Sequence, residues 1–406
     1  MVSAEERYLD KFFGRFLLVV SCTVSRFLKI ASESFCKEGK LKKVVLGTSL
    51  LVGVIALGCW VYLQHPKFGK LPAGELLAMV ERSPHYVDGE FQNLVDTPVL
   101  TEDRSTLSIL IENLRSSSEG LRPDDDIPSV KTDLHALDAD EDIVIWLGHS
   151  SYYVQLSGIR MLIDPVFSVD AAPIPFANRA FAGTNPYTAS DIPPIDYLLV
   201  THDHWDHLDY PTIKALKPQV GEVLTGLGVG AFFEKWGYDS EHVHEGDWND
   251  TFELENGLTL YVLPARHYSG RMLTRNRTLW VGFAIESPDR RLFFSGDSGY
   301  GPHFAEIGQR FDGFDLVSLD HGQYDPRWAY IHMTPEEAAE AAEELGANTL
   351  LPAHVGKFSL AQHPWQEPFE RITSASEERD YRLVTPMIGE PIWLDDSEQR
   401  FGAWWR

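Results

Sequence analysis

In residues 141–406, short runs of apolar residues alternate with turns. Runs of this length, bounded by turn residues, are typical of strands that are buried on both faces. Three helical stretches lie among them, at 211–216, 229–236 and 334–345. The predicted strands are Ile143–Leu147, Tyr152–Leu156, Met161–Ile163, Ile195–Val200, Leu258–Leu263, Leu279–Ile285, Leu292–Ser295, Leu316–Leu319 and Thr349–Leu351. This pattern favours a mixed α/β (α+β) domain in which helices cover sheet layers.

The N-terminal part has a different pattern, with one long apolar run. Val44–Leu63 holds twenty residues without a charge, which is about the length that a helix needs to cross ~30 Å of hydrocarbon. We therefore predict a transmembrane helix at 44–63, after an amphipathic cytoplasmic or interfacial segment at 1–43. A lipoprotein signal ending near Cys59 and a buried core helix are the alternatives. Residues 64–140 are predicted to connect this part to the main domain and to wrap around it.

Charge is distributed unevenly along the chain. The first 70 residues carry 11 Lys/Arg and 5 Asp/Glu, which leaves 24 Lys/Arg and 55 Asp/Glu in the remainder. Lysines directly before the apolar run predict a cytoplasmic N-terminus and an extracytoplasmic catalytic domain, at the inner membrane and in the periplasm if the protein is bacterial. So acidic a body argues against nucleic acid as a partner. All three cysteines lie in the first 60 residues, so the main domain has neither a disulfide framework nor a Cys-ligated zinc site.

The segment from His202 to His207 holds the densest candidate chemistry of the chain. It reads His-Asp-His-Trp-Asp-His and directly follows the predicted strand Ile195–Val200. In extended chain His202 and His204 point the same way, so both can bind one ion. Asp206 and His207, where the chain turns away, can face a second ion.

Three further candidate ligands stand where other predicted strands end. They are His267, Asp297 and His354, and each follows an apolar run into a turn of small residues. Imidazoles and carboxylates without thiolates suit zinc first, with iron or manganese as alternatives. Because a carboxylate has two oxygens, Asp297 can bridge the two ions. The predicted ligands are therefore His202, His204, His267 and Asp297 for one ion, and Asp206, His207, His354 and Asp297 for the other.

Two ions about 3.5–4 Å apart share a water molecule, lower its pKa and polarise the bond that it attacks. This arrangement predicts hydrolysis without a serine or cysteine nucleophile.

In the order of these motifs the chain resembles the metallo-beta-lactamase fold superfamily. Within that superfamily it looks most like N-acylphosphatidylethanolamine-hydrolysing phospholipase D and its bacterial relatives, including the ascorbate-6-phosphate-lactonase-like branch. The motifs that carry the likeness are His202–His207, Pro264–His267, Ser295–Gly299, Trp146–Ser150, Leu162–Ser168, Tyr324–Trp328, His332–Ala338 and His363–Trp365. The resemblance covers about residues 140–395. It implies a four-layer αββα sandwich, two zinc ions and phosphodiester hydrolysis at a lipid headgroup. The stretch His354-Val-Gly-Lys357 departs from the His-Trp-Gly-Thr of relatives, which puts the pocket wall and the substrate in question.

Asp206, Asp297 and His332 are the predicted catalytic residues. For His332 the resemblance implies a place beside the substrate or in proton handling, while a histidine of a helix-capping region is the alternative. His149 and Asp164 are candidates for orienting a ligand, and Arg327 and Lys357 are candidates for complementing a phosphate.

The leading hypothesis is a membrane-anchored binuclear zinc hydrolase that acts on a membrane phospholipid of the N-acylphosphatidylethanolamine type. A lactonase or other small-molecule hydrolase is the first alternative, and a non-catalytic metal-binding envelope scaffold is the second. The oligomeric state is left open, with a dimer as one option.

Overall fold

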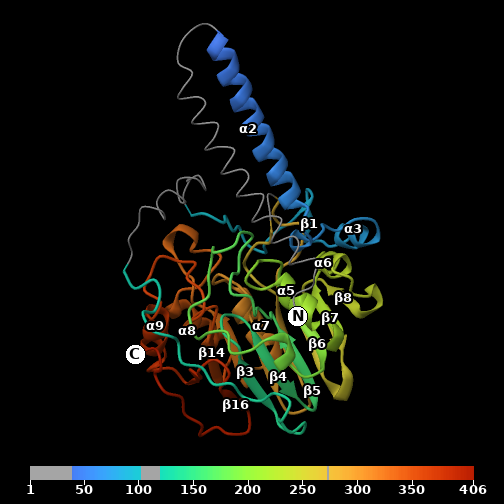
Figure 1. Cartoon of the computed structure of the whole chain (residues 1–406). Coiled ribbons are helices and arrows are strands. Elements are labelled where there is room, and N and C mark those ends of the chain that lie inside the picture. The colour runs from blue at the N-terminus through green and yellow to red at the C-terminus, as the bar shows by residue number, and fades with distance from the viewer. Residues whose placement is uncertain (1–38, 102–118, 272–273) are drawn as a thin grey trace. The chain divides into compact units, whose positions relative to one another are not determined.

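The computed structural model describes residues 39–101, 119–271 and 274–406 (Figure 1). The chain divides into one unit that ends at Phe68 and a second unit that spans Gly69–Arg406. Most of the predicted amphipathic segment at 1–43 lies outside the described residues. The first unit contains helix α2, Gly39–Leu63, and the short 3₁₀ helix η1, Pro66–Phe68.

Residues 44–63 lie within helix α2, but their predicted role as a membrane anchor is not confirmed. In the parts of the chain that the structure describes, no helix combines the length and the apolar character needed to cross a bilayer.

Two seven-stranded sheets form the second unit. The first sheet has the order β16 (Pro391–Trp393), β3 (Ile143–Trp146), β4 (Tyr152–Leu156), β5 (Ile159–Ile163), β6 (Ile195–Val200), β7 (Val220–Gly226) and β8 (Val243–Gly246). The second has the order β15 (Arg382–Leu383), β14 (Thr349–Ala353), β13 (Leu316–Asp320), β12 (Arg291–Phe294), β11 (Val281–Glu286), β10 (Thr259–Pro264) and β9 (Thr251–Glu253).

The α-helices of this unit that lie in the described residues are α3 (Glu75–Val80), α5 (Tyr210–Leu216), α6 (Gly230–Lys235), α7 (His303–Phe311), α8 (Pro335–Glu344) and α9 (Glu367–Ser376). Shorter elements are the hairpin of β1 (Tyr86–Val87) and β2 (Glu90–Phe91), and the 3₁₀ helices η2 (Ala189–Asp191), η3 (Lys217–Gln219), η4 (Ser240–His242), η5 (Glu255–Gly257) and η6 (Pro326–Trp328).

The buried side chains separate into layers that define a sandwich. In β3, Val144 and Trp146 belong to a core that also contains Leu260 of β10, so this core lies between the two sheets. Ile143 and Ile145 of the same strand belong to a second core with residues of α5 and α6. A third core joins the outer face of the second sheet to α7, α8 and α9. The order of layers is therefore helix, sheet, sheet, helix, as predicted.

Burial on both faces explains why these strands read as continuous apolar runs. All four residues of β3 and all five of β4 are buried. The register pairs Trp146 with Tyr152 across an antiparallel ladder, whereas β5 to β8 run parallel to one another. In the second sheet β12, β13 and β14 are parallel, so their carboxyl ends lie at one edge.

The connecting region is held to the main domain by hydrogen bonds from its backbone and its side chains. Asn93 Nδ2 donates to the carbonyl of His267 at 2.7 Å, and the amide of His267 donates to Asn93 Oδ1 at 3.1 Å. Further along, the amide of Val130 donates to the carbonyl of Ile388 at 2.8 Å.

Candidate metal centre

The His202–His207 segment leaves the end of β6 as a tight turn around a buried arginine. Arg271 Nη1 donates to the carbonyls of Asp203 and Leu208 at 2.8 and 2.7 Å. Its guanidinium carbon lies 3.9 Å from the centre of the Trp205 ring, a cation–π contact. Arg271 therefore fixes the turn that presents the imidazoles. Sequence reasoning missed this residue because its partners are backbone carbonyls far away in sequence.

Asp297 follows a glycine that no other residue replaces without strain. Gly296 has φ +60, and a Cβ built on it would lie 2.8 Å from the carbonyl oxygen of Val281 and 3.0 Å from Thr201 Cβ. The close approach brings the turn after β12 against the start of the turn after β6. His267 after β10 and His354 after β14 reach the same edge.

The first predicted ligand set converges on one point. His204 Nδ1 lies 2.9 Å from His202 Nε2 and 3.2 Å from His267 Nε2. Asp297 Oδ2 lies 3.6 Å from both of those Nε2 atoms. Zn–N bonds of about 2.0–2.1 Å imply about 3.3 Å between the donor atoms of a tetrahedral site. The spacing of these four side chains therefore fits a single zinc ion.

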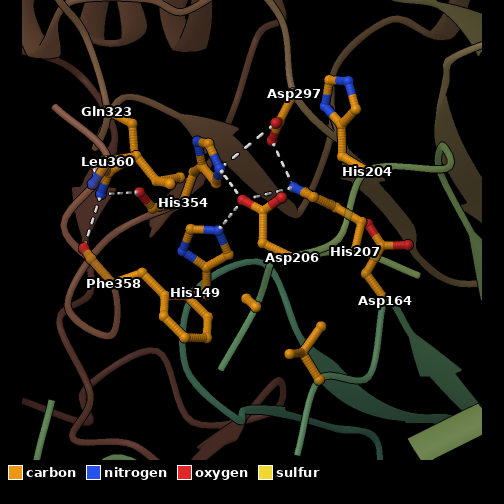
Figure 2. Close-up of polar contacts among 12 residues, drawn as sticks. His149, Asp164, His204, Asp206, His207, Asp297, Gln323, His354, Phe358 and Leu360 are labelled. Atoms are coloured by element: carbon orange, nitrogen blue, oxygen red, sulfur yellow. Dashed lines mark hydrogen bonds and ion pairs between the residues drawn. The ribbon is translucent and has the colours of Figure 1, made fainter. Parts of the chain in front are cut away.

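The second predicted ligand set also converges, and Figure 2 shows the contacts of Asp297 with His207 and His354. Asp297 Oδ1 lies 3.1 Å from His207 Nε2, and Asp297 Oδ2 lies 3.4 Å from His354 Nε2. Asp206 Oδ2 is 3.2 Å from His354 Nε2. Both oxygens of Asp297 thus face imidazole nitrogens, which is the arrangement that a bridging carboxylate requires.

His149 joins this second set. Its Nε2 lies 2.9 Å from Asp206 Oδ2 and its side chain is fully buried. With Asp206, His207 and His354 it forms a group whose donor atoms all lie within 4.8 Å of one another. His149 therefore holds Asp206 in position or supplies a further ligand atom.

Unsatisfied buried atoms test whether a metal belongs here. Among the described residues, His204 Nε2, His207 Nε2, Asp297 Oδ1 and His149 Nδ1 are buried without a hydrogen-bond partner. Buried polar atoms without partners are rare in proteins. Two of them, His207 Nε2 and Asp297 Oδ1, face each other at 3.1 Å, and this pairing of an imidazole nitrogen with an anionic oxygen donor fits cation binding.

Each set is held by its own outer hydrogen bonds. His267 Nδ1 donates to the carbonyl of Ile331 at 2.9 Å, whereas His207 Nδ1 lies 2.7 Å from Asp164 Oδ2. His354 Nδ1 lies 3.2 Å from Asp320 Oδ1. Such partners fix the tautomer and orientation of a ligand imidazole. Asp164 was a sequence candidate for this role, whereas Asp320 was missed although it ends a predicted strand in the same way as Asp297.

The same carboxylates decide which imidazoles carry protons in the metal-free chain. Burial lowers the pKa of His202, His204 and His267, to about 4 for His204. Burial also opposes protonation of His354, but Asp297 and Asp320 outweigh it and raise its pKa to about 10. The pKa of His207 is likewise raised, because Asp297 and Asp164 outweigh its burial.

A pocket of about 460 Å³ opens over the two ligand sets. Its polar walls include His204, Asp206, Asp297, His332 and His354. His332 Nδ1 lies 2.7 Å from Asp320 Oδ2, which leaves Nε2 as the nitrogen available to the pocket. Its apolar walls are Val99, Leu100, Ala171, Ala172, Trp328, Ile331 and Leu360, and exposed Arg275 also lines it.

Two sequence candidates do not serve as predicted. Lys357 is fully buried and its Nζ donates to the carbonyl of Val166 at 2.7 Å, so the prediction that it complements a phosphate is wrong. Arg327 pairs with Asp325, with Nη2 2.6 Å from Oδ2. Neither residue is among those that line the metal pocket.

Comparison with known proteins identifies the class. A family model described as "Beta-lactamase superfamily domain" matches residues 159–355. An isothiocyanate hydrolase from Delia radicum gut bacteria shares the fold, with a TM-score of 0.51 at 20% identity over 62% of this chain and 98% of that structure.

Two proteins with similar sequences indicate the subgroup of the superfamily. An uncharacterised protein of Mycobacterium tuberculosis is 37% identical over 338 residues, covering 82% of this chain and 90% of the relative. N-acyl-phosphatidylethanolamine-hydrolyzing phospholipase D 1 of Caenorhabditis elegans is 31% identical over 302 residues, covering 68% of this chain and 84% of the relative. The chain therefore belongs to the metallo-beta-lactamase superfamily of metal-dependent hydrolases, and it is a homologue of the N-acylphosphatidylethanolamine-hydrolysing phospholipase D proteins.

Proposed function

We propose that the protein is a binuclear zinc phosphodiesterase that cleaves phospholipids of the N-acylphosphatidylethanolamine type, as a phospholipase D does. The observation that carries this proposal is the pair of donor sets that meet at Asp297 on the wall of one pocket. The relative of Caenorhabditis elegans bears that activity in its name and spans most of the same sequence. The partners and location predicted from the sequence remain predictions.

Zinc, when bound, supplies Lewis acidity toward a phosphoryl oxygen and lowers the pKa of nearby water. The ligands would be His202, His204, His267 and Asp297 on one side, and Asp206, His207, His354 and Asp297 on the other. The protein's part is to fix these donors before substrate arrives, which avoids reorganisation during the reaction.

His332 is the chain's own proton carrier in this proposal. Asp320 accepts a hydrogen bond from Nδ1, so Nε2 faces the substrate side. From there it delivers a proton to the oxygen of the departing alcohol. The Asp320–His332 pair resembles the way in which a buried carboxylate orients a catalytic imidazole in hydrolases.

The remaining pocket residues divide by chemistry. The exposed guanidinium of Arg275 lies over the Tyr268 ring at 5.3 Å and is placed to contact an anionic phosphate. The apolar walls offer a surface for acyl chains. Together they suit an amphiphile with one negative charge better than a sugar phosphate.

The test is release of phosphatidic acid from N-acylphosphatidylethanolamine by the full chain after its metal content has been measured. We expect turnover by the wild type and by His135→Gln, a control at an exposed histidine outside the pocket, and turnover about a thousandfold or more lower by Asp297→Asn. Absence of turnover by fully zinc-loaded protein would contradict the proposal. Cleavage of soluble phosphosugar lactones instead would favour a small-molecule hydrolase.

A further inference from the structure

A hydrogen-bonded hairpin at residues 169–180 stands beside the metal pocket. The amide of Ala180 donates to the carbonyl of Val169 at 2.7 Å, and the amide of Ala171 donates to the carbonyl of Asn178 at 3.1 Å. Asn178 Nδ2 returns a bond to the carbonyl of Ala171 at 3.0 Å. Asp170 and Arg179 form an antiparallel bridge between these contacts. We call this segment the pocket hairpin.

The base of the pocket hairpin is packed into the protein. Ala171 and Ala180 form a buried apolar cluster with Val166 and Phe358. The Phe358 ring contacts His149 edge to face, at 5.0 Å between centroids. The base of the hairpin is therefore anchored to Phe358, which contacts the histidine that lies beside the predicted ligand Asp206.

The tip of the hairpin has the opposite character. Ile174 and Phe176 have exposed fractions of 55% and 80%, and Phe176 is the most exposed large apolar side chain that the structure describes. Residues 171–178 carry no charge, and prolines stand at 173 and 175. Phe176 also has φ +67, a conformation that is unfavourable for a bulky residue. A tip that is apolar, exposed to water and strained in its backbone indicates a binding surface.

The tip cannot lie far from the pocket opening. Ala172 and Asn178 both line the pocket, and each is two residues from Ile174 or Phe176. Two residues of chain span at most about 7 Å. Whatever binds the tip therefore lies beside the entrance to the metal centre.

We propose that the tip of the pocket hairpin inserts into the surface of a lipid bilayer and seats the pocket over its substrate. A specific protein partner needs roughly 20–30 residues on each side, and an eight-residue tip with two large side chains is too small for that. Insertion into a bilayer requires only apolar, uncharged side chains at the insertion point. An uncharged tip adds no repulsion of its own to that of a chain with net charge -25. The choice of a bilayer rests on the proposed lipid substrate.

A label at the tip tests the insertion directly and does not depend on turnover. In the full chain with Cys22, Cys36 and Cys59 changed to Ser, Phe176→Cys is coupled to an environment-sensitive fluorophore. The control is Asp289→Cys, an exposed position in the turn before β12, at the opposite end of that strand from Asp297. We expect zwitterionic phosphatidylcholine vesicles to shift the emission of the label at 176 to shorter wavelength and to leave that at 289 unchanged. The shift should persist from about 0.1 M to about 1 M NaCl, because the contact is apolar.

No shift at position 176, or an equal shift at both positions, would overturn the insertion. Because the label reports without hydrolysis, loss of the proposed activity and loss of insertion are distinguishable.

A second variant separates docking from chemistry. Ile174→Ser/Phe176→Ser should lower turnover of vesicle-borne substrate about tenfold or more and leave turnover of a monomeric short-chain analogue unchanged. Phe176→Trp, which keeps a large apolar ring, should retain vesicle turnover. Equal loss on both substrates would mean that the tip only supports the pocket wall and would refute the docking role.

Discussion

The two donor sets of the metal centre share Asp297 but differ in what holds their imidazoles. In the first set His267 is oriented by a backbone carbonyl, and His202 lies 3.0 Å from the hydroxyl of Thr201. In the second set His207 and His354 are oriented by the buried carboxylates Asp164 and Asp320. Carboxylate partners make an imidazole a stronger base and a stronger ligand. The second set is therefore the more negative environment.

This difference has a consequence for the metal-free chain. The imidazoles of the first set have lowered pKa values and are neutral near pH 7, so they are ready to bind a cation. Those of His207 and His354 have raised pKa values, so a metal must displace protons there. Desolvation keeps the imidazoles of the first set neutral, whereas neighbouring carboxylates keep those of His207 and His354 protonated until a metal binds.

The largest effect is expected from replacing Asp297, the residue that both donor sets share. Asp297→Asn should weaken metal binding at both sets, because it removes one anionic oxygen from each. We expect turnover to fall about a thousandfold or more, which corresponds to about 4 kcal/mol of transition-state stabilisation. Metal content per chain, measured alongside turnover, should fall well below that of the wild type. A variant that keeps two ions and full turnover would show that Asp297 does not bridge.

Replacing His332 asks whether the second set also serves proton transfer. His332→Gln should lower turnover about a hundredfold, in the range typical of a lost general acid. Metal content should stay unchanged, since His332 stacks on His354 and hydrogen-bonds to Asp320 but is not a predicted ligand. Loss of metal together with activity would instead place His332 among the ligands, with Asp297, Asp320 and His354 as its group.

Changing the outer carboxylates sharpens the comparison between the sets. Asp164→Asn and Asp320→Asn should each weaken metal binding about 10- to 100-fold, and only at the binding step that belongs to the second set. Calorimetric titration with zinc resolves the two steps. Asp320→Asn should also lower turnover more than Asp164→Asn does, because Asp320 orients both His354 and His332. Equal weakening of both steps would mean that the sets are not independent.

The smallest expected effect concerns Lys357, a fully buried base behind the metal pocket. Burial lowers its pKa to about 7, below the value of about 10.4 in unfolded chain. The folded state then binds fewer protons than the unfolded state between these values, so this group makes stability rise with pH from about 7 to about 10. The slope is at most about 1.4 kcal/mol per pH unit.

Lys357→Met should remove that contribution. Chemical denaturation between pH 7 and 9 measures it, and an unchanged slope in the variant would show that Lys357 keeps its charge in the fold.

Sequence reasoning succeeded where the signal was local. Each of the nine predicted apolar runs overlaps a strand of the structure, because strands buried on both faces are marked by composition alone. Thr334 caps α8 and forms a capping box with Glu337, as T-x-x-E followed by an apolar pattern predicts. Strands β7 and β8 were missed because glycine and charged residues interrupt them. Strands β15 and β16 are only two and three residues long. They form because they pair with neighbouring strands, and their own sequences carry no strand signal.

The sequence by itself determined the chemistry of the centre and the residues that were expected to supply it. Histidines and carboxylates at the ends of apolar runs are visible in one dimension, because a strand that ends in a turn places its next side chain at a sheet edge. Only the tertiary structure decided which outer groups hold them. Asp320 and Arg271 act through partners 34 and 68 residues away, and spacings of that kind have no pattern in sequence. The exposed tip at Phe176 is of the same kind, since solvent exposure depends on what the rest of the fold leaves uncovered.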